Sequence, residues 1–169
     1  MEGCPIVSAR TAIPERLLIA SGRFGRQLSA QRVAEMIAAG VRAAGCPEPD
    51  RCALEEPSGA PRAQLDALDF DTRMRAARAV VIAWEQLGES TLADSLAFEI
   101  ATRARQGGVP AYAVTAENAL DSFDARILDL QLILTVPNAR ALAAAGKQLG
   151  QVISRGCSGP RDRELRLPA

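Results

Sequence analysis

Short apolar runs that alternate with helical stretches are the feature of this sequence that most constrains its fold. The runs are rich in Leu, Ile, Val and Ala, and they occupy residues 16–22, 50–55, 79–84, 109–114 and 130–136. Runs of this length and composition are typical of parallel strands that are buried on both faces. Because helical stretches separate them, we predict a three-layer, Rossmann-like α/β domain: a mostly parallel sheet of about five strands with helices on both faces.

The intervening stretches carry helix signals. Ser29 is a candidate N-cap for a helix that ends at Gly45, Ser90 or Thr91 can cap another, and Asn138 can cap the last. We therefore expect one α/β domain over residues 15–154. Residues 1–14 are expected to form an N-terminal arm or an extra edge strand. Residues 155–169 are expected to form a polar C-terminal tail, as a loose end or an oligomer arm.

Composition excludes several function classes. The 169 residues have a formal net charge of zero, so a nucleic-acid partner is not expected. No apolar run is long enough for a membrane span, and the N-terminus lacks the pattern of a signal peptide. The chain has no histidine, which excludes catalytic mechanisms that depend on a Ser-His or Cys-His pair. Its four cysteines also show no CxxC spacing, so no metal site is expected. These features predict a cytoplasmic protein with reduced thiols.

The first candidate site is the loop after the first predicted strand, which reads SGRFGRQ over residues 21–27. A loop between a strand and a helix N-terminus favours an anion, because free N–H groups and the helix dipole point at it. Gly22 and Gly25 would let the backbone approach a ligand, and Arg23 and Arg26 would supply positive charge. Ser21 and Ser29 are further candidate ligand-binding residues. The alternative is an ordinary turn with solvated arginines.

The second candidate site follows the run at 79–84. Trp84 could stack on a ring, Glu85 could hold a metal or a substrate hydroxyl, and Glu89 and Thr91 follow at the same edge. The alternative is that Trp84 packs on a helix while the carboxylates favour the next helix N-terminus. Asn138 is either a plain cap or a ligand contact. Gly146 and Lys147 lack the rest of a P-loop and lie within a predicted helix.

Three ordered segments resemble type I glycerate kinases. Residues 17–30 read LLIASGRFGRQLSA, where that family has a strand followed by APDSFKGSLSA; residues 80–101 read VVIAWEQLGESTLADSLAFEIA; later segments read GVPAYAVTA and DLQLILTV. The resemblance covers residues 16–153. It implies a Rossmann-like domain that has lost the family's inserted domain, with ATP and Mg²⁺ as the implied cofactors.

Departures from the family pattern imply loss of activity. Gly22, Arg23 and Gly25 replace the family loop's Asp, Ser and Lys. The family's GEGRLD turn is WEQLGE here, which loses the glycines and the arginine but keeps Glu85, the one catalytic candidate. We interpret the chain as a degenerate member that binds a small anion or acts as an interaction module, as a homodimer that covers the face left by the missing domain. The alternatives are residual ATP-dependent phosphorylation of glycerate or a related hydroxy acid, and a structural or regulatory partner without a ligand.

Overall fold

A computed structural model describes residues 15–55 and 59–156 of the chain. The expected arm at 1–14 and nearly all of the expected tail lie outside these residues. Five strands form one sheet: β1 (Leu17–Ser21), β2 (Asp50–Ala53), β3 (Ala79–Leu87), β4 (Ala111–Asn118) and β5 (Leu130–Thr135). All neighbouring pairs are parallel and the order is β2-β1-β3-β4-β5, which is a doubly wound, flavodoxin-like arrangement. The predicted fold class is confirmed, and the sheet is parallel throughout.

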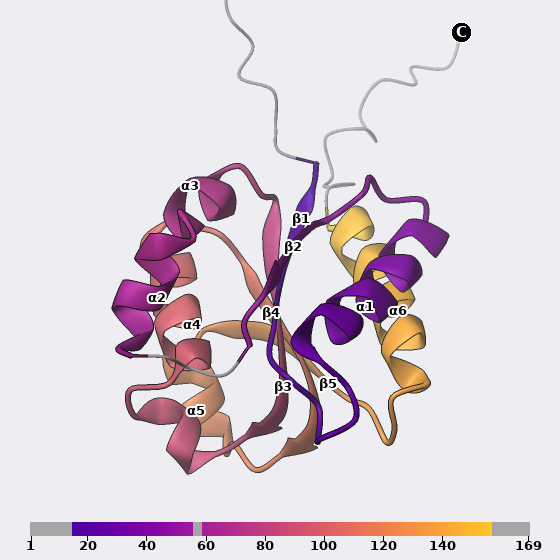
Figure 1. Ribbon diagram of the computed structural model, residues 1–169. Coiled ribbons are helices and arrows are strands. Elements are labelled where there is room, and N and C mark those ends of the chain that lie inside the picture. Colours follow the sequence, from indigo (N-terminus) through magenta and orange to yellow (C-terminus); the bar gives the residue numbers. More distant parts are fainter. Residues whose placement is uncertain (1–14, 56–58, 157–169) are drawn as a thin grey trace, which may run out of the picture.

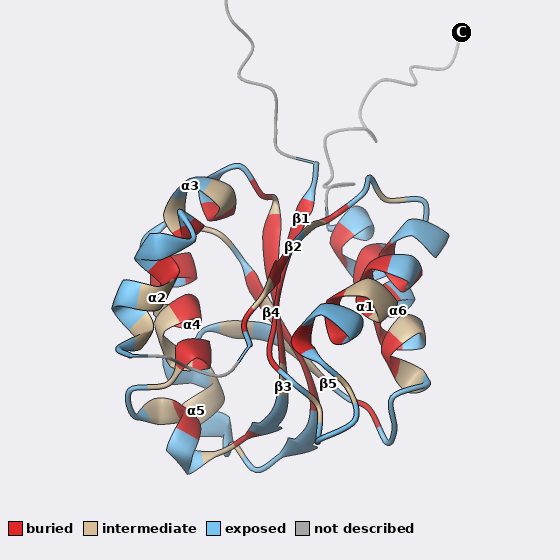
Figure 2. Cartoon of the chain, viewed as in Figure 1, coloured by how far each residue is buried: buried red, intermediate tan, exposed pale blue. Residues whose placement is uncertain are grey.

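The helices cover both faces of the sheet (Figure 1). They are α1 (Ala30–Ala43), α2 (Pro61–Ala67), α3 (Phe70–Arg75), α4 (Leu96–Gln106), α5 (Ser122–Ile127) and α6 (Ala141–Arg155), with a short 3₁₀ turn, η1 (Glu89–Leu92). On one side lie α1 and α6, and on the other lie α2, α3, α4 and α5. Buried residues concentrate in the strands and on the helix faces that meet them (Figure 2). No helix within the described residues is both long and apolar enough to cross a membrane.

Glycine brings α1 and α6 into backbone contact. A Cβ atom added to Gly146 would lie 2.2 Å from the carbonyl oxygen of Ile37, and one added to Gly40 would lie 1.9 Å from that of Ala143. Any side chain at either position would therefore force the helices apart. Gly146, which in sequence resembled the end of a P-loop, is a helix-packing residue.

A buried arginine joins the helices on the opposite side. Arg103 of α4 is 9% exposed, and its guanidinium group donates to Glu99 at 2.9 Å, to Asp66 at 2.8 Å and to Asp71 at 3.1 Å. Burial alone would lower the pKa of Arg103, but these three hydrogen bonds outweigh it and the pKa is raised. The cluster ties α4 to both α2 and α3.

Several elements differ from the sequence-based prediction, including β4, which continues to Asn118 and does not end at residue 114. The segment EPSGAPR at residues 56–62 was expected to be a loop, but α2 begins within it, with Pro61 in its first turn. Strand β3 was expected to end at Trp84, but it continues to Leu87, because its last residues pair with β4 through Gln86–Glu117 and Leu87–Asn118. Trp84 and Glu85 therefore lie within a strand rather than beyond it.

Candidate functional site

The candidate site lies where the strand order reverses. The chain leaves β1 for β2 on one side and later places β3 on the other side of β1, so the carboxyl ends of β1 and β3 form a topological switch point. In doubly wound sheets, ligands bind in the crevice at this point. Ser21 is paired with Ala83 in the sheet, and the N–H of Gly22 donates to the carbonyl of Ala83 at 2.9 Å. Both stretches singled out in the sequence therefore meet here.

The β1–α1 loop is closed by its own hydrogen bonds. Phe24 pairs with Leu28 in an antiparallel bridge, and its N–H donates to the Leu28 carbonyl at 3.0 Å. Gly25 makes the turn with a φ of 62°, a conformation that favours glycine. Arg23 reaches across the turn and donates to the carbonyl of Arg26 at 3.2 Å. The loop is thus a compact turn whose arginines lie on its exposed side.

The two serines of this loop have structural partners. The buried Ser21 hydroxyl donates to the carbonyl of Ala30 at 2.7 Å, which fixes the start of α1 against the end of β1. Ser29 is the N-cap of α1, and its hydroxyl accepts from the N–H of Arg32 at 3.3 Å. Their role as ligand-binding residues remains a prediction.

Gly22 and Trp84 form the joint between the loop and β3. A Cβ at Gly22 would lie 3.2 Å from three atoms of the Trp84 indole, so the loop backbone rests on the ring. Trp84 is half-buried and also packs against the core on the α4 side. A side chain at this position would push the indole aside by a few tenths of an ångström.

Beyond the sheet, β3 and β4 continue together as a two-stranded extension. The buried Thr115 hydroxyl is 3.0 Å from the carbonyl oxygen of Glu85 and 2.9 Å from that of Glu117. The Gln86 amide donates to the Glu117 carboxylate at 3.0 Å. These contacts hold the Glu85 backbone in place while its side chain is exposed toward the loop.

Thr91 and Ser95 shape the turn that follows. The buried Thr91 hydroxyl accepts from the N–H of Gly88 at 2.9 Å. The Ser95 hydroxyl donates to the Thr91 carbonyl at 2.6 Å and accepts from the N–H of Phe98 at 3.0 Å, as the N-cap of α4. Thr91 therefore has a structural role, and a ligand-binding role remains a prediction.

A cavity of about 280 Å³ lies between these elements. Its lining side chains are mostly polar and come from the loop, from β3 and from the turn before α4: Arg23, Trp84, Glu85, Gln86, Ser90, Thr91 and Ser95. The sequence indicated Arg23, Trp84, Glu85 and Thr91 as site residues but missed Gln86, Ser90 and Ser95. Residues 84–86 carry no apolar pattern in the sequence that would have shown β3 continuing and carrying Gln86 to this edge.

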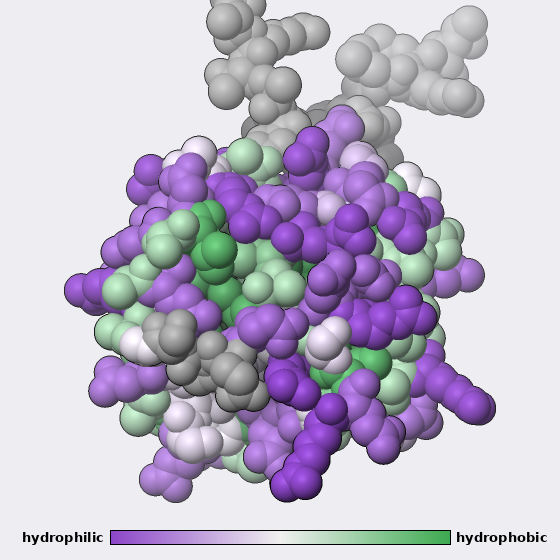
Figure 3. All heavy atoms as spheres, viewed as in Figure 1, coloured by the Kyte–Doolittle hydropathy of each residue, from purple (hydrophilic) through white to green (hydrophobic). Residues whose placement is uncertain are grey.

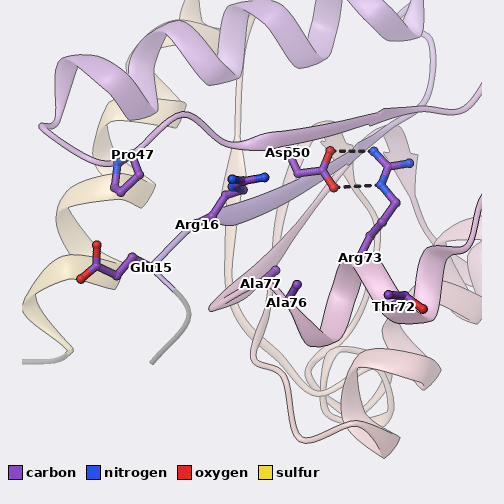
Figure 4. A pocket seen from close by; sticks show the side chains of 8 residues that line it. All are labelled: Glu15, Arg16, Pro47, Asp50, Thr72, Arg73, Ala76 and Ala77. Carbon is purple, nitrogen blue, oxygen red and sulfur yellow. Dashed lines mark hydrogen bonds and ion pairs between the residues drawn. The ribbon is translucent and has the colours of Figure 1, made fainter. Parts of the chain in front are cut away.

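A larger cavity, of about 570 Å³, lies at the opposite, amino ends of the strands (Figure 4). Glu15, Arg16, Pro47 and Ala77 contribute to its lining, beside a bidentate ion pair in which Arg73 donates to Asp50 at 2.7 and 2.8 Å. The hydrogen bonds from Arg73 lower the pKa of Asp50. We favour the smaller cavity because it lies at the switch point, whereas the Asp50 and Arg73 groups of the larger one already satisfy each other.

The described residues offer no ligand cluster to a metal ion, and one of their two cysteines is buried. No group of three His, Cys, Asp or Glu side chains within residues 15–55 and 59–156 could hold a metal ion. Burial raises the pKa of the Cys52 thiol, which makes it a poor nucleophile.

Comparisons with known proteins assign no family to this chain. No protein-family model and no curated protein matches this chain. Among solved structures, it is similar to a response regulator receiver domain from Rhodospirillum rubrum, with 19% identity over 82% of this chain and 94% of that one and a TM-score of 0.49. It is also similar to an oxidoreductase from Corynebacterium diphtheriae, with 12% identity over 85% of this chain and 99% of that one and a TM-score of 0.47.

The assignment to the glycerate kinase family is wrong. No family model supports it, and the structural neighbours are a receiver domain and an oxidoreductase. The physical reason is that an apolar strand, a small-residue turn and a capped helix recur wherever parallel strands alternate with helices. The family was the only basis for ATP and Mg²⁺ as cofactors, for a lost inserted domain and for a kinase role of Glu85. These three expectations therefore lose their support.

Proposed function

We propose that this chain is a binding domain for a small hydroxy acid, held in the cavity at the carboxyl ends of β1 and β3. The observation that carries the proposal is the position of this polar cavity at the switch point of the sheet, walled by Arg23 on one side and by Glu85 and Gln86 on the other.

The residues that line the cavity favour a ligand that carries both a negative charge and a hydrogen-bond donor. Arg23 offers a guanidinium group that matches a carboxylate. Glu85 offers only acceptor oxygens, which suit a hydroxyl donor and oppose a bare polyanion such as phosphate. A hydroxy acid carries both a carboxylate and a hydroxyl, and so satisfies both walls.

The volume limits the size of the ligand. About 280 Å³ is below the usual range for drug-sized ligands, which begins near about 300 Å³. A molecule of a few carbon atoms fits within this space. The mostly polar lining also agrees with a ligand that is hydrophilic throughout.

Thermal unfolding in the presence of candidate ligands tests the proposal. Lactate, glycerate and malate are compared with acetate, which lacks the hydroxyl, and with inorganic phosphate. At a concentration one hundred times Kd, a bound ligand stabilises the fold by about 2.7 kcal/mol. We expect a rise in Tm with a hydroxy acid, a smaller one with acetate and none with phosphate.

Matched variants place the ligand in the cavity. Glu85→Gln should weaken binding of the hydroxy acid, because an amide is a poorer acceptor than a carboxylate. Glu89→Gln changes an exposed carboxylate of η1 that does not line the cavity, and should leave binding unchanged. Equal responses to hydroxy acid and acetate, or equal binding by both variants, would contradict the proposal. An unchanged Tm with every compound would favour a domain without a small ligand.

A further inference from the structure

Two successive residues of β3 line the cavity at the switch point. Trp84 and Leu87 both pack against the core on the α4 side. Strict alternation would place residues three apart on opposite faces of the sheet, so the strand does not alternate regularly between them. Glu85 and Gln86 lie in this interval, and both reach the cavity. The wall formed by β3 therefore carries two polar side chains in succession.

A hydrogen bond to β4 fixes one end of the Gln86 amide. Its Nε2 atom lies 3.0 Å from a carboxylate oxygen of Glu117, the residue paired with Gln86 in the register of β3 and β4. An ionised carboxylate only accepts hydrogen bonds, so it attracts the NH2 group of the amide and repels the amide oxygen. The Thr115 hydroxyl, 2.9 Å from the Glu117 carbonyl oxygen, holds the backbone of this partner. Glu117 is therefore a positioning residue for Gln86.

The amide oxygen of Gln86 is the atom left for the cavity. The nitrogen and the oxygen of an amide diverge from the same carbon atom, and here the nitrogen is turned toward β4. Among the described residues that line the cavity, none belongs to β4. Gln86 therefore presents Oε1, which is an acceptor, next to the acceptor oxygens of Glu85.

We propose that the ligand carries two neighbouring hydroxyl groups, the first bound by Glu85 and the second by Gln86. This inference rests on the proposed function and narrows it from hydroxy acids to vicinal dihydroxy acids. One hydroxyl has a single hydrogen and can donate to only one of the two acceptors, whereas two neighbouring hydroxyls satisfy both. Hydrophilic residues predominate on the face shown in Figure 3, including its lower edge, where the β1–α1 loop of Figure 1 lies. Because the ligand displaces water at this edge, an acceptor left without a donor would weaken binding.

The other hydroxyl groups of the lining are less suited to this role. The Ser95 hydroxyl donates to the carbonyl of Thr91 and accepts from the N–H of Phe98. The Thr91 hydroxyl accepts from the N–H of Gly88. Ser90 is the remaining rival for the second hydroxyl of the ligand, and a variant at this position separates it from Gln86.

Titration calorimetry with lactate and glycerate tests the proposal, because these two anions differ only by the second hydroxyl. Glycerate should bind the wild-type chain about fivefold more tightly than lactate. Gln86→Met removes the acceptor but keeps much of the length of the side chain, and should bring the two affinities within about twofold of each other. Glu85→Gln should instead weaken the binding of both anions. Gln86 is exposed, so its variant should fold, which far-UV circular dichroism checks.

The role of Glu117 is tested with a ligand that accepts a hydrogen bond but does not donate one. Glycerate methylated on its second hydroxyl meets this requirement, and should bind the wild-type chain no more tightly than lactate. Glu117→Lys replaces an acceptor by a donor, which turns the NH2 group of Gln86 toward the cavity, where it can donate to the ether oxygen. The affinity for the ether relative to lactate should then rise about threefold. Glu89→Lys makes the same change of charge outside the lining and should leave this ratio unchanged.

Each outcome supports or overturns the proposal. A preference for glycerate that is lost in Gln86→Met supports it. Lactate binding without a preference for glycerate overturns it and leaves the hydroxy-acid function standing, and so does a preference that Ser90→Ala loses and Gln86→Met keeps. An equal rise of the ether-to-lactate ratio in the two lysine variants contradicts the positioning role of Glu117. Absence of binding by both anions overturns the proposal together with the function on which it rests.

Discussion

The helices of the two layers are joined to one another by opposite kinds of contact. On one side, α1 and α6 meet backbone to backbone because glycine leaves no side chain between them. On the other side, α2, α3 and α4 are joined through the charges around Arg103. The first contact depends on shape and should be indifferent to pH. The second depends on ionised groups and should respond to it.

The largest effect is expected on the glycine side. Gly146→Ala should lower the free energy of unfolding by about 3 kcal/mol or more, because the new Cβ would overlap the Ile37 carbonyl and the helices would have to separate. This cost exceeds the gain of about 1 kcal/mol that alanine usually brings to a helix. Urea denaturation measures the difference.

Gly156→Ala is the matched control for this prediction. Gly156 follows the same helix, and a Cβ there would lie 3.6 Å from the nearest atom, which is an ordinary contact. We expect a change within about 0.5 kcal/mol. Equal losses in the two variants would show that the helix contact is not what makes Gly146 necessary.

A smaller loss is expected on the charged side. Arg103→Met keeps much of the buried length of the side chain but removes its hydrogen bonds to Glu99, Asp66 and Asp71. We expect a loss of about 2 kcal/mol, since the carboxylates of Asp66 and Asp71 are exposed enough to regain water. Arg103→Lys should recover part of it. A methionine variant as stable as the wild type would mean that the cluster does not hold the layer.

The smallest effect is expected for the ion pair between Asp50 and Arg73, and it should depend on pH. Because Arg73 lowers the pKa of Asp50, the pair stabilises the fold above the ordinary pKa of 3.8, and this contribution disappears as pH falls through the lowered value. Asp50→Asn should cost about 1 kcal/mol at neutral pH. The difference from the wild type should vanish at low pH, whereas the Gly146→Ala difference should persist. A constant Asp50→Asn difference across the acid range would contradict this assignment.

The strands could be predicted because burial on both faces requires continuous apolar runs, and such runs are visible in the sequence. The end of β3 could not be predicted by the same rule. Its residues after Ala83 pair with β4 beyond the main sheet, and Trp84, Glu85 and Gln86 have no apolar pattern that would show it. The helix at Pro61–Ala67 was missed because the proline and glycine before it were taken to continue as a loop.

The candidate site was located from sequence, but its inner contacts were not. Loops after parallel strands meet at one edge, which brought Arg23 and Glu85 into one prediction. The hydroxyl groups of Ser21, Ser29 and Thr91 were expected to face a ligand, whereas they bond to backbone groups nearby. A hydroxyl group can bond either to a ligand or to a nearby backbone group, and the sequence does not show which. The choice depends on where the folded backbone places its N–H and carbonyl groups. The family was misassigned because local patterns were again the only information. Apolar strands and small-residue turns are common to many α/β proteins, so sharing them does not show a common family.

The bridge between Phe24 and Leu28 also bears on how fast a ligand could enter. A loop that is ordered only on binding adds a conformational step to association and an entropic cost to affinity. Here the turn is already closed by its own backbone hydrogen bond, and Gly22 already rests on the indole of Trp84. A ligand would therefore bind to a loop that is already ordered. Differences in affinity between ligands would then arise from their dissociation rates and not from their association rates.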